Sequence, residues 1–270
     1  MNFQSICEVL KTAGIENYKF EARILLEEFC GSVSEFEKYE SEELEAAIKK
    51  RCQHYPLQYI IGKWEFYGYE FKVNENCLIP RADTETVIEA AKKLLTTGES
   101  VRFADLCAGS GCIGITLLRE LKNSVCDAVE LYESTLKVAK ENAKINGVTD
   151  RYNPILADVL AGNCLKGEYD AIISNPPYIR QDVLETLSDE VKREPIAALD
   201  GGEDGLVFYR AMLDLYEKNL KVGGVFIFEI GYDQGQSLRE LASVKQMECE
   251  IICDLGGRDR VAVITRKALA

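Results

Sequence analysis

Four residues in the middle of the chain, Asn175, Pro176, Pro177 and Tyr178, have the types and spacing to hold a flat nitrogen group. They directly follow a short apolar run, which is typical of a strand, and the carboxyl ends of parallel strands face the ligand crevice. The two prolines stiffen the loop and remove two backbone N–H donors. The side-chain oxygen of Asn175 and the carbonyl of Pro176 therefore remain as acceptors for the two hydrogens of a substrate –NH₂ group.

Such a pair of acceptors suits an amide or aryl amine, whose delocalised lone pair is a poor nucleophile. Two in-plane hydrogen bonds hold the nitrogen and favour its pyramidalisation, so that the lone pair faces an electrophilic methyl group. Tyr178 packs against the flat group, and positioning with preorganised charge supplies the rate enhancement. This chemistry needs neither a metal nor a histidine, and His54 is the only histidine. The alternative is an Asn-Pro turn without function.

A glycine loop lies 66 positions before Asn175 (175 − 109). Gly109 and Gly111 permit a tight turn and a close approach of backbone to ligand. Glu130, nineteen positions beyond Gly111 (130 − 111), has the place of an acidic residue that accepts both hydroxyls of a ribose. With Gly114, these glycines match the dinucleotide fingerprint, so a dehydrogenase is one interpretation.

The other interpretation is S-adenosylmethionine, which has no pyrophosphate and lies with its amino-acid part over the loop. Asp105, at the end of the preceding strand, favours a ligand with a positive sulfonium and ammonium. Asp158 follows a third short strand and has the position to bond an adenine amino group, although an ordinary surface aspartate is equally consistent with the sequence.

The elements around these residues indicate an α/β fold. Short apolar runs alternate with amphipathic helices, which predicts a mostly parallel sheet covered on both faces. The runs are Val101–Cys107, Val125–Leu131, Tyr169–Ser174 and Val225–Ile230. We expect a helix to begin at Asp83 or Thr84 and to end near Leu95. Two late runs, Glu248–Cys253 and Val261–Thr265, predict an antiparallel pair at the sheet edge.

The N-terminal part has a different pattern. Apolar residues at helical spacing predict a small helical domain over residues 1–60, and the alternating segment Trp64–Val73 predicts a hairpin around a glycine. We therefore divide the chain into a helical domain (1–60), a hairpin linker (61–80) and an α/β domain (81–270). We also expect Trp64 to lie in the hairpin core.

Composition excludes several classes of protein. The formal net charge of −13, with no basic recognition segment, disfavours direct binding to nucleic acid. No apolar run reaches a bilayer's thickness and the start of the chain lacks a signal peptide, so we expect no membrane association. The ten scattered cysteines contain no C-x-x-C pair, which favours reduced thiols in the cytoplasm and no metal site.

The sequence resembles the PrmC/HemK family of protein-(glutamine-N5) methyltransferases over nearly its whole length. The blocks that carry the resemblance extend from the helical start to the C-terminus. They are A-R-I-L-L-E (22–27), P-L-Q-Y-I-I-G (56–62), I-P-R-A-D-T-E (79–85), D-L-C-A-G-S-G (105–111), N-P-P-Y (175–178), E-P-I-A-A-L-D-G-G-E-D-G-L (194–206), F-E-I-G-Y-D-Q-G (228–235) and G-R-D-R-V (257–261).

The resemblance implies a Rossmann-like methyltransferase domain, with a mostly parallel seven-stranded sheet and an antiparallel edge strand, joined by a hairpin to a helical substrate-binding domain. It implies that S-adenosyl-L-methionine, giving S-adenosyl-L-homocysteine, methylates the Gly-Gly-Gln glutamine of class-1 peptide chain release factors. Asn175, Pro176 and Tyr178 would be catalytic, and Pro177 would join them in holding the glutamine. The implied cofactor contacts are Cys107, Ala108, Gly109, Ser110, Gly111, Glu130, Asp158, Val159 and Asn175.

Other interpretations stay open at this point. They are methylation of another protein glutamine, such as one on a ribosomal protein, methylation of a nucleic-acid adenine, or an assembly factor without transfer activity. We expect a monomer that contacts its partner with both domains. Arg81 and Glu85 are candidates for an ion pair at the site's rim, or for an exposed surface pair. Glu194–Pro195 and the loop Gly201–Gly205 are candidates for a mobile lid, or for an ordinary surface loop.

Overall fold

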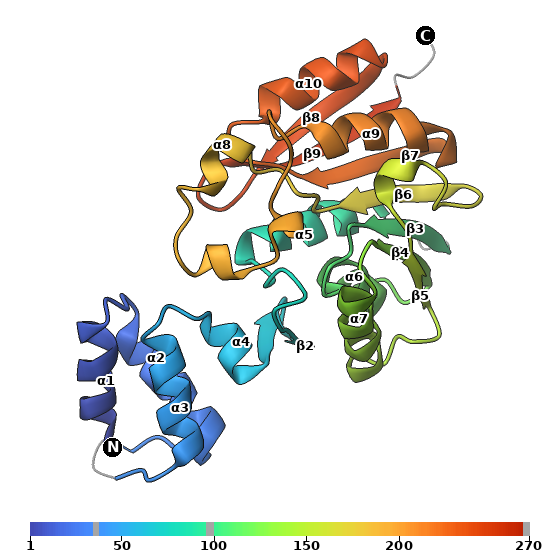
Figure 1. Ribbon diagram of the computed structural model, residues 1–270. Coiled ribbons are helices and arrows are strands. Elements are labelled where there is room, and N and C mark those ends of the chain that lie inside the picture. The colour runs from blue at the N-terminus through green and yellow to red at the C-terminus, as the bar shows by residue number, and fades with distance from the viewer. Residues whose placement is uncertain (35–37, 96–99, 267–270) are drawn as a thin grey trace.

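The computed structural model describes residues 1–34, 38–95 and 100–266. Four N-terminal helices form one group, and an α/β part built on a large sheet forms the other (Figure 1). A small two-stranded sheet lies in the chain between them. The last four residues of the segment expected to form the α/β domain, 267–270, lie outside the described residues.

The N-terminal helices are α1 (Phe3–Thr12), α2 (Tyr18–Cys30), α3 (Glu42–Arg51) and the short α4 (Leu57–Ile61). Asn2 begins α1 with a capping box, because its side chain accepts from the amide of Ser5 while the Ser5 hydroxyl accepts from the amide of Asn2. The helices pack around a core of their own, which includes Ile6, Leu10, Leu25, Leu26 and Leu44. This packing confirms the helical start predicted from spacing.

The expected hairpin is present, with strands β1 (Lys63–Phe66) and β2 (Tyr69–Lys72). Its two turn residues, Tyr67 and Gly68, have φ angles of 53° and 75°, as a type I′ turn requires. Phe66 and Phe71 form its buried centre, with ring centroids 6.1 Å apart. Trp64 is only partly buried and packs against a separate cluster that contains Tyr59 and Val73. The hairpin core is therefore made by the two phenylalanines.

The large sheet has seven strands in the order β5-β4-β3-β6-β7-β9-β8. All neighbouring pairs from β5 to β7 are parallel, whereas β9 pairs antiparallel with both β7 and β8 near one edge. This arrangement confirms the predicted mostly parallel sheet and the late antiparallel pair. The bounds are β3 (Val101–Leu106), β4 (Ser124–Glu130), β5 (Tyr152–Leu156), β6 (Tyr169–Ser174), β7 (Leu220–Glu229), β8 (Met247–Cys253) and β9 (Asp259–Arg266).

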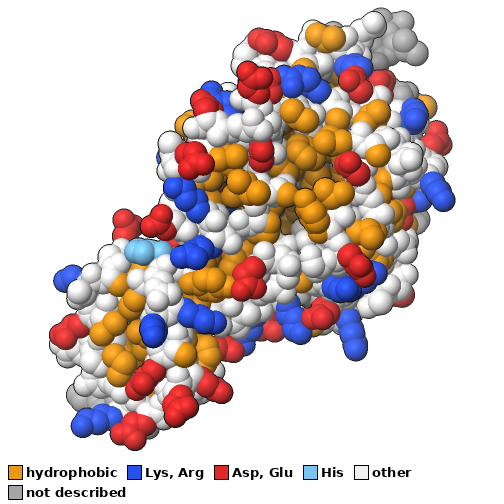
Figure 2. All heavy atoms as spheres, in the orientation of Figure 1, with side chains coloured by type: hydrophobic (Ala, Val, Ile, Leu, Met, Phe, Trp, Pro, Cys, Tyr) orange, Lys and Arg blue, Asp and Glu red, His pale blue; other side chains and the backbone are white. Residues whose placement is uncertain are grey.

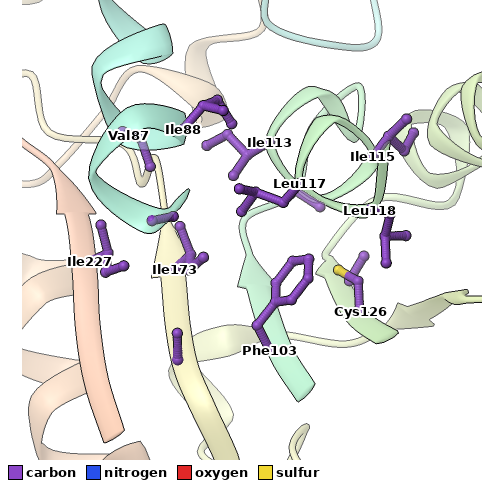
Figure 3. Close-up of a cluster of buried hydrophobic side chains, with 14 of the residues drawn as sticks. Val87, Ile88, Phe103, Ile113, Ile115, Leu117, Leu118, Cys126, Ile173 and Ile227 are labelled. Carbon is purple, nitrogen blue, oxygen red and sulfur yellow. The ribbon is translucent and has the colours of Figure 1, made fainter. Parts of the chain in front are cut away.

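Helices cover both faces of this sheet. On one face α5 (Glu85–Leu95), α6 (Cys112–Glu120) and α7 (Glu133–Ile145) pack against side chains of β3, β6 and β7. Figure 3 shows this layer, with Ile88 of α5 and Leu117 of α6 above Phe103 and Ile173 of the strands. On the other face α9 (Val207–Tyr216) and α10 (Gly235–Val244) bury a second core.

Helix α5 begins differently from the expectation. A single 3₁₀ turn, η1 (Ala82–Thr84), leads into it, and the amide of Thr84 donates to the carbonyl of Arg81. Asp83 and Thr84 thus lie inside this turn, and neither is its N-cap residue, which is Arg81. Thr84 is buried, and its hydroxyl contacts the site described below.

The connection from β6 to α9 contains short helical pieces, α8 (Gln181–Leu184), η3 (Val191–Arg193) and η4 (Ile196–Ala198). Two further 3₁₀ turns, η2 (Val159–Ala161) and η5 (Glu217–Asn219), follow β5 and α9. No helix among the described residues is long and apolar enough to span a bilayer.

Candidate active site

The loop after β3 turns back sharply into α6. Cys107 and Gly109 have φ angles of 60° and 57°, and Gly111, the N-cap of α6, has 80°. A Cβ on Gly111 would lie 2.8 Å from both Cδ1 of Ile115 and the hydroxyl of Tyr152, so a side chain there is excluded by packing. A Cβ on Gly109 would meet nothing within 4 Å. Gly111 therefore lets the helix pack closely, and Gly109 leaves space beside the loop.

Glu130, the last residue of β4, closes the other side of this loop. Its Oε2 accepts from the amide of Gly109 at 3.0 Å, and its Oε1 accepts from the amide of Tyr132 at 3.1 Å. The side chain is buried but lines the cavity beside the loop. Each carboxylate oxygen keeps a lone pair for a further donor, so Glu130 is held in place with capacity left for hydroxyl groups.

A cavity of about 190 Å³ lies at the carboxyl ends of β3, β4 and β6. It contains most of the site residues expected from the sequence: Cys107, Ala108, Gly109, Ser110, Glu130, Asp158, Val159, Asn175 and Pro177. Gly111, Pro176 and Tyr178 are not among its lining residues. On this face of the molecule hydrophobic side chains gather around a hollow in the α/β part (Figure 2).

Several walls of the cavity come from residues that the sequence reasoning missed. Leu131, Tyr132 and Leu160 form an apolar rim, and Cys77, Leu78 and Ile79 close the side next to the hairpin. The first three lie one or two positions after Glu130 or Asp158, so their positions after strand ends were a usable signal. The segment 77–79 is brought in from the linker and has no such signal.

Asp105 does not line the cavity, contrary to its expected role toward a positive ligand. Its side chain is buried, and Oδ2 accepts from the amide of Gly114 at 2.9 Å. Burial raises the pKa of Asp105 to about 7, against the opposing effect of the Gly114 hydrogen bond. The carboxyl is directed to the first turn of α6, so it braces the loop from behind.

Asn175 stands at the end of β6 and faces the cavity. Its Nδ2 donates to the hydroxyl oxygen of the buried Thr84 at 3.4 Å. With the amide nitrogen engaged in this way, the side-chain oxygen Oδ1 is the group left for a ligand. Asn175 thus lines the cavity as expected, and the role of its oxygen as the acceptor for a substrate amide stays a prediction.

Tyr178 points to a second cavity, of about 220 Å³, which shares Leu78, Arg81, Asn175 and Ala198 with the first. Its hydroxyl donates to Oε1 of Glu229 at 3.2 Å. A Cβ on Gly201 would lie 2.7 Å from Cα of Tyr178, so this glycine is required by the close approach of the two segments. Burial raises the pKa of Tyr178, which keeps its hydroxyl protonated.

The expected ion pair between Arg81 and Glu85 is wrong. Arg81 pairs with Glu194, whose other oxygen accepts from the amide of Ile79 at 3.0 Å, while Glu85 accepts from the amide of Tyr67 at 3.0 Å. The buried carboxylate of Glu194 is the better partner, because it already lies against the Ile79 backbone. Glu194 thereby fixes the segment whose neighbours Pro195, Ala197 and Ala198 line the first cavity.

Comparison with known proteins agrees with this fold and site. Residues 84–211 match the family described as the methyltransferase small domain, and residues 3–62 match the PrmC N-terminal domain. A solved methyltransferase from Pyrococcus furiosus superposes with a TM-score of 0.56 at 17% identity, covering 76% of this chain and 91% of that one, which shows the fold. The fold, the glycine loop and the tetrad together define a methyltransferase.

Curated relatives narrow the class. The release factor glutamine methyltransferase of Moorella thermoacetica is 37% identical, over 96% of this chain and 95% of its own length. That of Clostridium botulinum is 35% identical, over 94% of each chain. The chain belongs to the PrmC/HemK family of release factor glutamine methyltransferases.

Proposed function

We propose that the protein transfers a methyl group from S-adenosyl-L-methionine to the side-chain nitrogen of the glutamine in the Gly-Gly-Gln motif of class-1 peptide chain release factors, and so acts on translation termination. The observation that supports the proposal is that Asn175, whose amide nitrogen contacts Thr84, lines one cavity together with the glycine loop and Glu130. Membership of the family supports the choice of release factors as substrate.

The residues around the first cavity fit the cofactor. The open space beside Gly109 leaves room for its amino-acid part over the loop Cys107–Gly111, in which Gly111 contributes through packing. Glu130 keeps acceptor capacity for two ribose hydroxyls, and Asp158–Val159 lie where they would contact the adenine. The apolar rim of Leu131, Tyr132 and Leu160 suits a purine face. When bound, the cofactor supplies an electrophilic methyl group.

The tetrad would hold and orient the glutamine. Oδ1 of Asn175 and the carbonyl of Pro176 accept the two amide hydrogens, and the bond from Asn175 to Thr84 keeps the asparagine from turning its nitrogen inward. Pro177 and Tyr178 bind the flat amide from the loop. Because every group is an acceptor or a packing surface, catalysis consists of positioning and preorganised charge.

The N-terminal helices (residues 1–60) would dock the release factor, with the hairpin linker (61–80) joining them to a methyltransferase domain (81–270). The net charge of −13 disfavours a nucleic-acid partner, so we propose a protein substrate. We also propose that the enzyme is a monomer that contacts this substrate with both domains. None of the ten cysteines forms a disulfide, which is consistent with action in the reducing cytoplasm.

A transfer assay tests the proposal. Purified protein and labelled S-adenosylmethionine are mixed with an unmodified class-1 release factor, or with a copy whose Gly-Gly-Gln glutamine is changed to alanine. Label is expected on the first and none on the second. Transfer instead to a ribosomal protein, or salt-sensitive transfer to an adenine, would overturn the substrate and keep the methyltransferase.

A further inference from the structure

Glu229, the last residue of β7, lies buried next to the tetrad and has no assigned role. Its relative exposure is 1%, and its Oε1 accepts from the Tyr178 hydroxyl at 3.2 Å. Its Oε2 is buried without a hydrogen-bond partner among the residues that the structure describes. Glu229 also lines the second cavity together with Asn175 and Tyr178. A buried carboxylate with an unfilled oxygen at this place calls for a functional explanation.

A second connection runs from Glu229 to the other end of the tetrad. The hydroxyl of Thr84 faces the Glu229 carboxylate and opposes the rise that burial gives its pKa. The same hydroxyl accepts from Nδ2 of Asn175 at 3.4 Å. The Thr84 hydroxyl thus lies between Asn175 and a carboxylate that already accepts from Tyr178 and whose Oε2 is open to a further donor.

Fold stability does not explain this arrangement. The guanidinium of Arg260 forms its ion pairs with Asp83 at 3.1 Å and Asp254 at 3.3 Å, and no ion pair with Glu229 is among those of the described residues. Burying a carboxylate without an ion pair costs free energy, and an apolar side chain of similar volume would stabilise the fold more. The position of Glu229 is thus better explained by a role in positioning the tetrad side chains than by a contribution to the stability of the fold.

We propose that Glu229 is a positioning residue for methyl transfer, which holds Tyr178 directly and Asn175 through Thr84 so that the tetrad meets the substrate amide in one geometry. The inference rests on the proposed function of the tetrad. It adds a residue from a different strand, 54 positions beyond Asn175 (229 − 175), that touches neither reacting atom.

The ionisation of Glu229 then affects activity. Burial raises its pKa to about 7, while the Thr84 hydroxyl, the charge of Arg260 and the Tyr178 hydroxyl oppose the rise and Asp83 adds to it. The charge of Glu229 also acts on the Cys112 thiol and the Tyr209 hydroxyl, and burial raises the pKa of both, so they stay neutral. Because an ionised carboxylate accepts a hydrogen bond more strongly than a neutral one, the tetrad is held more firmly as pH rises through about 7.

Kinetics of four variants test the proposal: Glu229→Ala, Glu229→Gln, Tyr178→Phe and the double variant Glu229→Ala with Tyr178→Phe. Glu229→Ala should lower kcat by about tenfold to a hundredfold, as misplacement of a reacting group does, with cofactor Kd unchanged. Glu229→Gln keeps an acceptor, so it should recover most of this loss but give a flat pH profile, about fivefold below the native enzyme at pH 8. The double variant should be no worse than its more impaired single variant, because both remove the same contact.

Two controls accompany these variants. Glu250→Gln, on the exposed strand β8, removes a carboxylate far from the tetrad and should leave kcat and its pH profile unchanged. Asp105→Asn removes the other carboxyl whose pKa burial raises to about 7, and should leave the inflection near pH 7 in place. Native kcat in Glu229→Ala, or fully additive losses in the double variant, would overturn the proposal.

A measurement that needs no substrate separates this proposal from the proposed function. The side-chain amide signal of Asn175 in an NMR spectrum, assigned by its loss in Asn175→Ala, should titrate near pH 7 in the native protein and not in Glu229→Gln. If the chemical shift of this amide does not change with pH in the native protein or in Glu229→Gln, the coupling between Glu229 and Asn175 is overturned, even if release factors are methylated. A titrating signal would support it even if the substrate is a different one.

Discussion

Arg51 donates through Nη2 to Oε1 of Glu21 at 3.0 Å, and both side chains are largely buried, with 3% and 12% of their surfaces exposed. The pair joins helices α2 and α3 inside the N-terminal group. The same Nη2 lies 2.6 Å from Oε1 of Glu190, in the segment between α8 and η3. One guanidinium therefore links the N-terminal helices to the segment that borders the second cavity, where Leu187 is part of the lining.

Replacing Arg51 with methionine should destabilise the protein, because it leaves the carboxylate of Glu21 buried without its cation. Removing one partner of a buried pair costs about 3–5 kcal/mol, and we expect the free energy of unfolding to fall by about 3 kcal/mol. Urea denaturation followed by circular dichroism measures the change. Lys137→Met is the matched control, since its pair with Glu133 is about two-thirds exposed and should contribute less than about 0.5 kcal/mol. Equal effects of the two substitutions would contradict the burial argument.

Replacing Asn175 with alanine should abolish transfer while the cofactor still binds. In the proposed mechanism its oxygen is the side-chain acceptor of the tetrad, whereas the glycine loop, Glu130 and Asp158–Val159 would form the remaining cofactor contacts. Loss of one preorganised polar group at a reacting centre costs about 100- to 1,000-fold in kcat. Single-turnover transfer and calorimetric cofactor titration give the two quantities. Asn163→Ala, at a position outside the first cavity, should behave as the native protein. Retained transfer in Asn175→Ala would remove the tetrad from the mechanism.

Gly114→Ala tests whether the glycine loop depends on close packing of α6 against β3. An added Cβ would lie 2.9 Å from both Oδ2 of Asp105 and Sγ of Cys126, two buried atoms with little room to move. Overpacking of this kind costs about 1–3 kcal/mol. We expect that loss in thermal unfolding, together with weaker cofactor binding as the loop shifts.

Gly256→Ala is its control. The nearest atom to an added Cβ there is Oδ1 of Asp254, at 3.2 Å on the surface, so stability should change little. If Gly114→Ala were as stable as the native protein, the close approach of α6 to β3 would be wrong.

The parts of the site that could be predicted from sequence are those formed by residues that are consecutive in the chain. The loop Cys107–Gly111 and the tetrad each follow an apolar strand, and the ends of parallel strands lie at one sheet edge, so their meeting at a cavity followed from chain order. The hairpin was equally local, since its turn needs only Tyr67 and Gly68. The strand and helix predictions rested on hydrophobic periodicity, which is also a local property of the sequence.

What could not be predicted depends on contacts between distant segments. Asn175 and Tyr178, in the loop after β6, contact Thr84 of η1 and Glu229 at the end of β7, and no spacing in the sequence connects these segments. Arg81 had an acidic residue four positions away at Glu85, yet its partner is Glu194, 113 positions further on. Local spacing offers a plausible pair, while the fold decides which carboxylate is near.

Asp105 illustrates a third case, in which the residue was noticed but its direction was not. A strand end exposes one side chain to the crevice and directs the next to the opposite face, and sequence alone does not say which is which. The buried orientation of Asp105 has a consequence that can be measured, because burial raises its pKa from 3.8 to about 7.

Stability should therefore fall as pH rises from about 4 to about 7, to the extent that Asp105 contributes. The unfolded chain releases the Asp105 proton near pH 4, whereas the folded protein keeps it up to about pH 7, so over this range the folded state binds more protons and loses stability as pH rises. Asp105→Asn keeps an oxygen for the amide of Gly114 and cannot ionise. We expect its stability relative to the native protein to be higher at pH 8 than at pH 4.5 by a few kcal/mol, because a tenfold change in proton affinity corresponds to roughly 1.4 kcal/mol. Urea denaturation at the two pH values measures this difference, and a gap that does not change with pH would show that Asp105 is ionised in the folded protein throughout.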